Sequence, residues 1–260
     1  MQNILDDYAH QNALRDVDTR LKLVLGGGAI VVGILSTGPV APLFIAISMA
    51  AITLFLARIP GRFYATLLTI PLSFAVLSAG VILFLQGGGE TLFALPVGGF
   101  TLTATTGSAD QAALVLARTF GGMCSLFFIA LTTPMVEIFA VMRALRLPAE
   151  FVDLAMLIYH FIFMLIGEAV ATHNAQEIRQ GYAGFRNSLR SFPMLAGALF
   201  VRAWEKGEDL ILAMDARCYD GKLALEEEGD SPSPLSTAGV AVYLVTAGAI
   251  ALLTGGVQLF

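Results

Sequence analysis

Residues 64–85 form the stretch YATLLTIPLSFAVLSAGVILFL, which contains no charged side chain. A helix of about 20 apolar residues crosses the hydrocarbon core of a bilayer, so this run predicts a transmembrane helix. Four further apolar runs occur in the chain, at residues 21–35, 39–56, 112–132 and 237–253. The sequence therefore predicts an all-α integral membrane protein with about five transmembrane helices.

The overall composition agrees with a membrane protein and argues against a soluble globular domain. Hydrophobic residues make up 57% of the 260 residues and charged residues 13%, with a mean hydropathy of +0.77. A soluble domain carries about 25% charged residues. The first 20 residues are polar and lack the order of a signal peptide. Two cysteines, Cys124 and Cys218, do not make a metal or disulfide framework.

The basic residues predict the orientation, because lysine and arginine stay on the cytoplasmic side of a membrane. Arg15, Arg20 and Lys22 precede the first run, and Arg58 and Arg62 follow the second. Residues 86–110 contain no basic residue, and their alternating pattern predicts a short external hairpin. We therefore expect a multi-pass protein of the cell (inner) membrane, with a cytoplasmic N-terminus and an external C-terminus.

The segment 151–172 is apolar enough to span, but nine basic residues lie between positions 143 and 222. Residues 134–235 are therefore expected in the cytoplasm, with helices along or dipping into the membrane face. Prolines are common at helix starts, so Pro134, Pro148 and Pro193 predict the starts of these helices. The predicted helix ranges are 135–147, 149–181 and 193–217.

This reading divides the chain into three parts. Residues 1–133 hold the N-terminal segment and a four-helix transmembrane region, and residues 134–223 hold the cytoplasmic helices. Residues 224–260 hold an acidic linker and the last transmembrane helix. Within the fourth run, Arg118 is expected to face protein or water rather than lipid.

Both long cytoplasmic helices are predicted to end at an arginine, Arg179 in one and Arg217 in the other. A basic residue at a helix C-terminus can simply favour the helix dipole, by about 0.3–1 kcal/mol. The repetition of the feature favours a second interpretation. Two long helices that end alike can serve as levers for two equivalent sockets on partner proteins.

Two stretches, LRLPAEFVDLAMLIYHFIFMLIGEAVATHNAQEIRQGY and RSFPMLAGALFVRAWEKGEDLILAMDARCYDG, occupy residues 145–182 and 190–221. They resemble the coupling region of T components of energy-coupling-factor (ECF) transporters, and most of all the CbiQ branch, which serves cobalt uptake. The resemblance implies that short Ala-Arg-Gly-like motifs end two coupling helices and dock into grooves on two ATPase subunits. One motif falls on Ala216, Arg217 and Cys218, with cysteine where glycine is usual. The other falls on Ile178, Arg179 and Gln180 and keeps only the arginine.

The same resemblance implies the partners and cofactors. No G-x-x-x-x-G-K-[ST] phosphate loop occurs, so ATP and Mg²⁺ are expected on two copies of a partner ATPase, and no cofactor on this chain. The three histidines, His10, His160 and His173, lack the spacing of metal ligands. The transported metal is therefore expected on a CbiM-like substrate-binding S component, with a small accessory membrane subunit as a further partner. No nucleic-acid partner is expected.

Three alternatives remain open from the sequence. The first is a T component for nickel or another substrate, because cobalt follows from the resemblance alone. The second is a self-sufficient secondary transporter, which typically shows internal repeats and buried ionisable residues near the middle of the membrane. The third is an intramembrane enzyme, although residues 112–172 contain no recognisable nucleophile–base motif.

Overall fold

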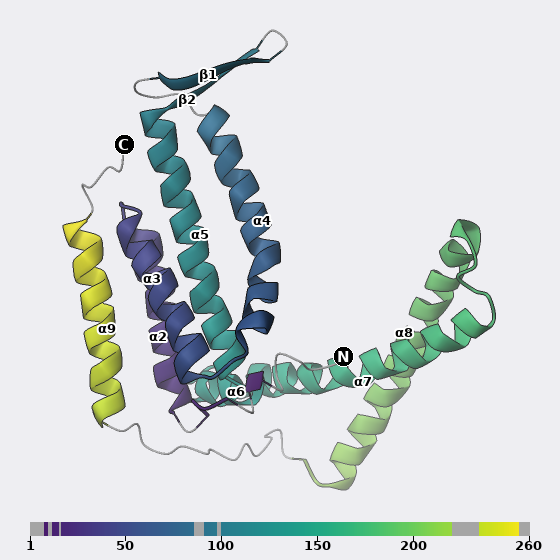
Figure 1. Cartoon of the computed structure of the whole chain (residues 1–260). Coiled ribbons are helices and arrows are strands. Elements are labelled where there is room, and N and C mark those ends of the chain that lie inside the picture. Colours follow the sequence, from purple (N-terminus) through teal and green to yellow (C-terminus); the bar gives the residue numbers. More distant parts are fainter. Residues whose placement is uncertain are drawn as a thin grey trace. The chain divides into compact units, whose positions relative to one another are not determined.

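The computed structural model describes residues 8–9, 12–15, 17–85, 91–97, 100–219 and 234–254 (Figure 1). The chain forms two compact units. The first, called here the membrane unit, contains the described residues up to 135 together with the last helix. The second, called here the coupling unit, contains the described residues from 136 to 219.

The membrane unit is a helical bundle with a β-hairpin at one end. Its elements are α2 (Thr19–Leu35), α3 (Val40–Ala51), the π-helix η1 (Ile52–Leu56), α4 (Gly61–Leu85), β1 (Thr91–Val97), β2 (Phe100–Thr105), α5 (Thr106–Thr132) and α9 (Pro234–Leu253). Helix α5 packs against α2, α3 and α4, and α9 packs against α2 and α3 (Figure 1).

The turns between these elements follow from the local sequence. Residues 36–39 separate α2 from α3, as the Ser-Thr-Gly interruption predicts. The predicted break at 58–62 lies between η1 and α4. The predicted hairpin is confirmed, because β1 and β2 pair antiparallel over Thr91–Thr105. Thr105 and Ser108 exchange side-chain and backbone hydrogen bonds in a capping box that starts α5.

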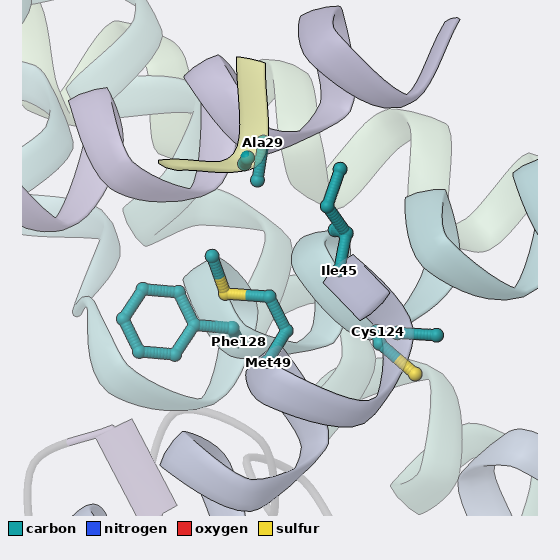
Figure 2. Close-up of a cluster of buried hydrophobic side chains, with 7 residues drawn as sticks. Ala29, Ile45, Met49, Cys124 and Phe128 are labelled. Carbon is teal, nitrogen blue, oxygen red and sulfur yellow. The ribbon is translucent and has the colours of Figure 1, made fainter. Parts of the chain in front are cut away.

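The core of the membrane unit lies between α2, α3, α5 and α9. Its largest members are Ile45 and Met49 of α3 and Phe128 of α5, all of which are almost fully buried. Figure 2 shows Met49 beside Phe128, with Ala29 and Cys124 in the same cluster. Small residues allow the helices to approach closely, since a Cβ on Gly121 would lie 2.7 Å from the carbonyl oxygen of Pro42.

The coupling unit is built from α6 (Met135–Ala144), whose first residue belongs to the membrane unit, α7 (Ala149–Ile178) and α8 (Phe185–Ala216). The predicted ends at 147 and 181 are therefore three residues too late. The predicted start at Pro193 is wrong, because α8 begins at Phe185 and Pro193 lies inside the helix. A helix can include a proline at the cost of one backbone hydrogen bond, so the residue alone does not fix a helix start.

Four helices are long and apolar enough to cross a membrane among the described residues: α4, α5, α7 and α9. The fold class predicted from the sequence, an all-α membrane protein, is confirmed. The apolar helix formed by α3 and η1 is shorter, at Val40–Leu56, and α2 has 17 residues. Helix α7 is as long and as apolar as the helices predicted to span the membrane. Its location along the membrane face, rather than across the membrane, therefore stays a prediction.

Candidate functional site: two matching helix ends

The first predicted coupling residue, Arg179, is the C-cap of α7. The next residue, Gln180, has a left-handed backbone with φ of 60°. Two hydrogen bonds close the helix end: the N–H of Gln180 donates to the carbonyl of Glu177 at 2.9 Å, and the N–H of Gly181 donates to that of Gln176 at 2.8 Å. This pair of bonds defines a Schellman motif, which satisfies carbonyl groups that the helix leaves free.

The second predicted coupling residue, Arg217, occupies the same position at the end of α8. It is the C-cap, and Cys218 follows with φ of 54°. The N–H of Cys218 donates to the carbonyl of Asp215 at 3.0 Å, and the N–H of Tyr219 donates to that of Met214 at 3.1 Å. The backbone of α8 therefore ends in the same motif as that of α7, although the two sequences share little beyond the arginine.

This geometry gives a physical reason for the Ala-Arg-Gly pattern. The third position of the motif is the residue that adopts positive φ, which glycine tolerates at no steric cost. Here the position holds Gln180 at one end and Cys218 at the other. The arginine just before it is the C-cap residue, at the boundary of the regular helix. Arg179, Gln180, Ala216, Arg217 and Cys218 are all exposed.

The two motifs lie at opposite ends of α8. Arg179 precedes the short turn that leads into α8 at Phe185, and Arg217 directly follows the last residue of α8. Helix α8 has 32 residues and therefore a length of about 48 Å. A single binding groove cannot hold two side chains this far apart, so the geometry suits two separate sockets.

A hydrogen-bond network fixes the turn beside Arg179. The Ser191 hydroxyl donates to the carbonyl of Gly181 at 2.7 Å, and the Gln176 amide donates to the carbonyl of Ser191 at 3.3 Å. The Tyr182 hydroxyl donates to the side chain of Gln176 at 2.8 Å. Gly181 has no room for a side chain, because a Cβ would lie 2.8 Å from both the carbonyl oxygen of Gln176 and Ser191 Oγ.

Two ion pairs connect the helices of the coupling unit. Arg202 of α8 pairs with Glu168 of α7, and both side chains are partly exposed. Arg143 of α6 pairs with Asp153 of α7, whose side chain is 5% exposed. The sequence does not reveal these pairs, because each joins residues of different helices. Two features of the sequence could have pointed to them: the charged residues of α8, and Asp153 within an apolar stretch of α7.

The two histidines in the described part of the chain, His160 and His173, lie on the same helix, α7. His160 is exposed, and its ring lies 6.3 Å from that of its neighbour Phe161. The ring of His173 lies 4.4 Å from that of Tyr182. His10 lies outside the described residues. No group of three or more metal-ligating side chains occurs in the described part of the chain.

The arginine inside the membrane unit contacts protein, as expected. The guanidinium of Arg118 donates a hydrogen bond to the carbonyl of Ser36, the C-cap residue of α2. A positive charge at this position favours the helix dipole of α2.

The geometry defines a class of protein: a helical membrane protein in which two long helices end alike, each with an exposed arginine as its C-cap. The CbiQ family, described as "Cobalt transport protein", matches residues 10–228. The chain belongs to the CbiQ family of cobalt transport proteins, the T components of ECF transporters.

Individual relatives agree with this assignment. The chain is 50% identical over 94% of its length to a putative fused cobalt transport protein CbiMQ of Methanocorpusculum labreanum, and it spans 41% of that longer protein. It is 31% identical to the cobalt transport protein CbiQ of Rhodobacter capsulatus, with 89% of this chain and 90% of that protein covered. It is 26% identical to the energy-coupling factor transporter transmembrane protein EcfT of Limosilactobacillus fermentum, with 80% of each covered.

Proposed function

We propose that this protein is the transmembrane coupling subunit of an ECF-type cobalt transporter. Arg179 and Arg217 anchor the ends of α7 and α8 in the grooves of two ATPase subunits. Movement of the ATPases during ATP hydrolysis passes through α7 and α8 to a substrate-binding membrane subunit. The chain itself is non-catalytic, and ATP and Mg²⁺ bind to the ATPases.

The observation that carries this proposal is the matching backbone geometry at the C-terminal ends of α7 and α8, where an arginine is the C-cap of each helix. An arginine offers five N–H donors in a planar head that suits carboxylate or carbonyl groups in a groove. Two exposed apolar residues lie close to the first arginine in the chain: Ile178, which directly precedes it and is 84% exposed, and Phe185, the first residue of α8, which is 83% exposed. Arginine and aromatic residues dominate the binding energy of protein interfaces. Helix α8, which is described throughout, contains no buried residue and thus leaves its surface available to partners.

The partner that binds the metal is proposed to be a CbiM-like subunit. The fused relative of Methanocorpusculum labreanum is named CbiMQ and is more than twice as long as the part that this chain matches. Fusion of two proteins into one chain is expected where both work in one assembly. Cobalt as the transported ion rests on the names of the family and of the relatives. The membrane is proposed to be the cell membrane, with a cytoplasmic N-terminus and an external C-terminus.

Arginine substitutions test the coupling role. Arg179→Ala and Arg217→Ala should each weaken ATPase binding at least about tenfold, because an arginine anchor at an interface commonly contributes more than 1.4 kcal/mol. The double variant should abolish cobalt uptake while the protein still inserts into the membrane. The measurements are co-purification with the ATPases and cobalt uptake in membrane vesicles that contain all subunits.

Arg146 and Arg190 provide matched controls. Arg146 has φ of 59° just beyond the end of α6, and Arg190 is an exposed arginine on α8. Arg146→Ala and Arg190→Ala should leave ATPase binding within about twofold of the parent, since exposed charges away from an interface contribute little. Normal amounts of ATPase on the double variant would refute the proposal.

A further inference from the structure

A cavity of about 300 Å³ opens at the surface of the membrane unit, between the beginning of α2, η1 and the beginning of α9. Its lining includes Leu21, Leu25, Ile52, Leu56, Val240 and Tyr243. Helices α2 and α9 both begin at the end of the bundle away from the β1–β2 hairpin (Figure 1). The cavity therefore lies near one membrane surface, on the side where the basic residues predict the cytoplasm.

The shape and chemistry of the cavity favour an apolar occupant. Its volume is at the lower end of the range of about 300–1,000 Å³ found for ligand sites. One wall is η1, whose π-helical hydrogen bond runs from the N–H of Ala57 to the carbonyl of Ile52 at 3.1 Å. Short π-helical segments often occur at functional sites. An apolar cavity holds water poorly, because a buried water needs two to four polar partners.

Two exposed arginines belong to the segment that lines the same end of the cavity. Leu14, Val17 and Leu21 line it, while Arg15 and Arg20 from the same segment are exposed. Lys22 also lines it, and its ammonium donates to the carbonyls of Arg15 at 3.4 Å and Thr132 at 3.3 Å. The carboxylate of Asp18 accepts the backbone N–H of Arg20 as the N-cap of α2.

We propose that this cavity binds one acyl chain of an anionic phospholipid, whose phosphate pairs with Arg15 and Arg20. Apolar walls beside exposed basic side chains match the two halves of such a lipid. Basic pockets between membrane helices on the cytoplasmic side recognise anionic headgroups in this way. The proposal requires insertion of the membrane unit and does not depend on the coupling role of α7 and α8.

Two glycines of α9 provide a test variant and a matched control. A Cβ added at Gly239, which lines the cavity, meets no atom within 4 Å, and the same holds for Gly248, which is not among the lining residues. Gly239→Leu therefore adds a side chain at the wall of the cavity without a clash, and Gly248→Leu adds the same side chain elsewhere on the helix. Each protein is reconstituted in nanodiscs with equal amounts of phosphatidylglycerol and phosphatidylcholine, and the lipids retained after release are counted by native mass spectrometry.

The parent and Gly248→Leu should retain phosphatidylglycerol with a preference of about tenfold over phosphatidylcholine, which two basic residues at a membrane surface can supply. Gly239→Leu should retain none. The double change Arg15→Gln and Arg20→Gln, at exposed positions that tolerate substitution, should retain lipid without the preference. Equal retention of the two lipids by the parent would overturn the proposal. So would undiminished retention by Gly239→Leu, or no retained lipid in the parent, which would point to a helix of a partner membrane protein as the occupant.

Discussion

Gln180 and Cys218 hold a backbone conformation that glycine adopts more easily than any other residue. Their φ angles are 60° and 54°. A left-handed conformation costs a non-glycine residue about 1–2 kcal/mol, because its Cβ approaches the carbonyl oxygen. The Schellman hydrogen bonds at each end oppose this cost. The positive φ at each arginine end therefore lowers the stability of the protein, and glycine at that position would avoid this loss.

Cys218→Gly should raise the stability of the end of α8. We expect a gain of about 0.5–1 kcal/mol, since the relief of strain exceeds the added chain entropy of glycine. Thermal unfolding of the purified protein in detergent measures this change. Ala213→Gly is the matched control within α8 and should lower stability by about 1 kcal/mol. A loss of stability with Cys218→Gly would contradict the assigned backbone.

Gly181 is the residue of the α7–α8 turn that tolerates no side chain. In Gly181→Ala, the new Cβ would meet the carbonyl oxygen of Gln176 and Ser191 Oγ at 2.8 Å. The turn must then shift, which should cost about 1–3 kcal/mol and misplace Arg179. Thermal unfolding and ATPase binding are the measurements.

Gly197→Ala serves as the comparison for Gly181→Ala. Gly197 lies within α8, and a Cβ there meets no atom within 4 Å. Alanine should therefore stabilise the helix by up to about 1 kcal/mol and leave ATPase binding unchanged. If Gly181→Ala behaved like Gly197→Ala, the turn would be looser than the structure indicates.

At the scale of elements, the two ion pairs of the coupling unit differ in burial and therefore in their expected effect. Glu168 and Arg202 have side chains that are 35% and 48% exposed, so water screens their attraction. Such pairs contribute about 0–1 kcal/mol. Asp153 is 5% exposed and pairs with Arg143 across the α6–α7 turn. Removal of one partner from a buried pair leaves an uncompensated charge.

Asp153→Ala should lower the stability of the protein by about 3 kcal/mol, within the range expected for a broken buried pair. Denaturant or thermal unfolding in detergent gives the value. The double change Arg143→Met and Asp153→Leu should be less harmful than Asp153→Ala, because neither charge then remains. Glu150→Ala, an exposed acid in the first turn of α7, should change stability by less than about 0.5 kcal/mol. Equal effects of Asp153→Ala and Glu150→Ala would exclude the buried pair as a stabilising contact.

The helices of the membrane unit could be predicted from sequence because each is apolar and bounded by polar or glycine residues. The β1–β2 hairpin could be predicted from its alternating pattern and central glycines. The start of α8 could not, because Pro193 is compatible with both a first turn and a helix interior. Among the candidate site residues, Arg179 and Arg217 could be named from the sequence, but Cys218 carries no sign of its positive φ. The contacts of Gly181 and Asp153 depend on how helices pack and are not encoded in any local pattern.

For the whole molecule, the sequence predicts on which side of the membrane each segment lies. The two cysteines of the chain offer a direct test of this prediction. Cys124 is buried and Cys218 is exposed, so the natural chain carries one accessible thiol in its described part. If the coupling unit is cytoplasmic, an impermeant maleimide should label Cys218 in inside-out vesicles and not in intact cells.

A reporter on the opposite side completes the topology test. Gln111 is exposed near the start of α5, whereas the nearby Ser108 is buried within the capping box. Gln111→Cys in a Cys218→Ser background should therefore react in intact cells only. Labelling of Cys218 in intact cells would mean that α7 spans the membrane and that the predicted orientation of the coupling unit is wrong.

Helix α8 runs unbroken from Phe185 to Ala216. The number of its residues therefore also sets the angle between the two arginine ends around the helix axis. Each residue of an α-helix advances the axis by about 1.5 Å and turns it by about 100°. Deletion of one residue between Ala203 and Ala213 would preserve the contacts at both ends of α8. It would nevertheless rotate Arg217 by about 100° around the axis of α8 relative to Arg179. Under the proposed function, the number of residues in α8 therefore specifies which pair of partner grooves this protein can engage, independently of the side chains in the middle of the helix.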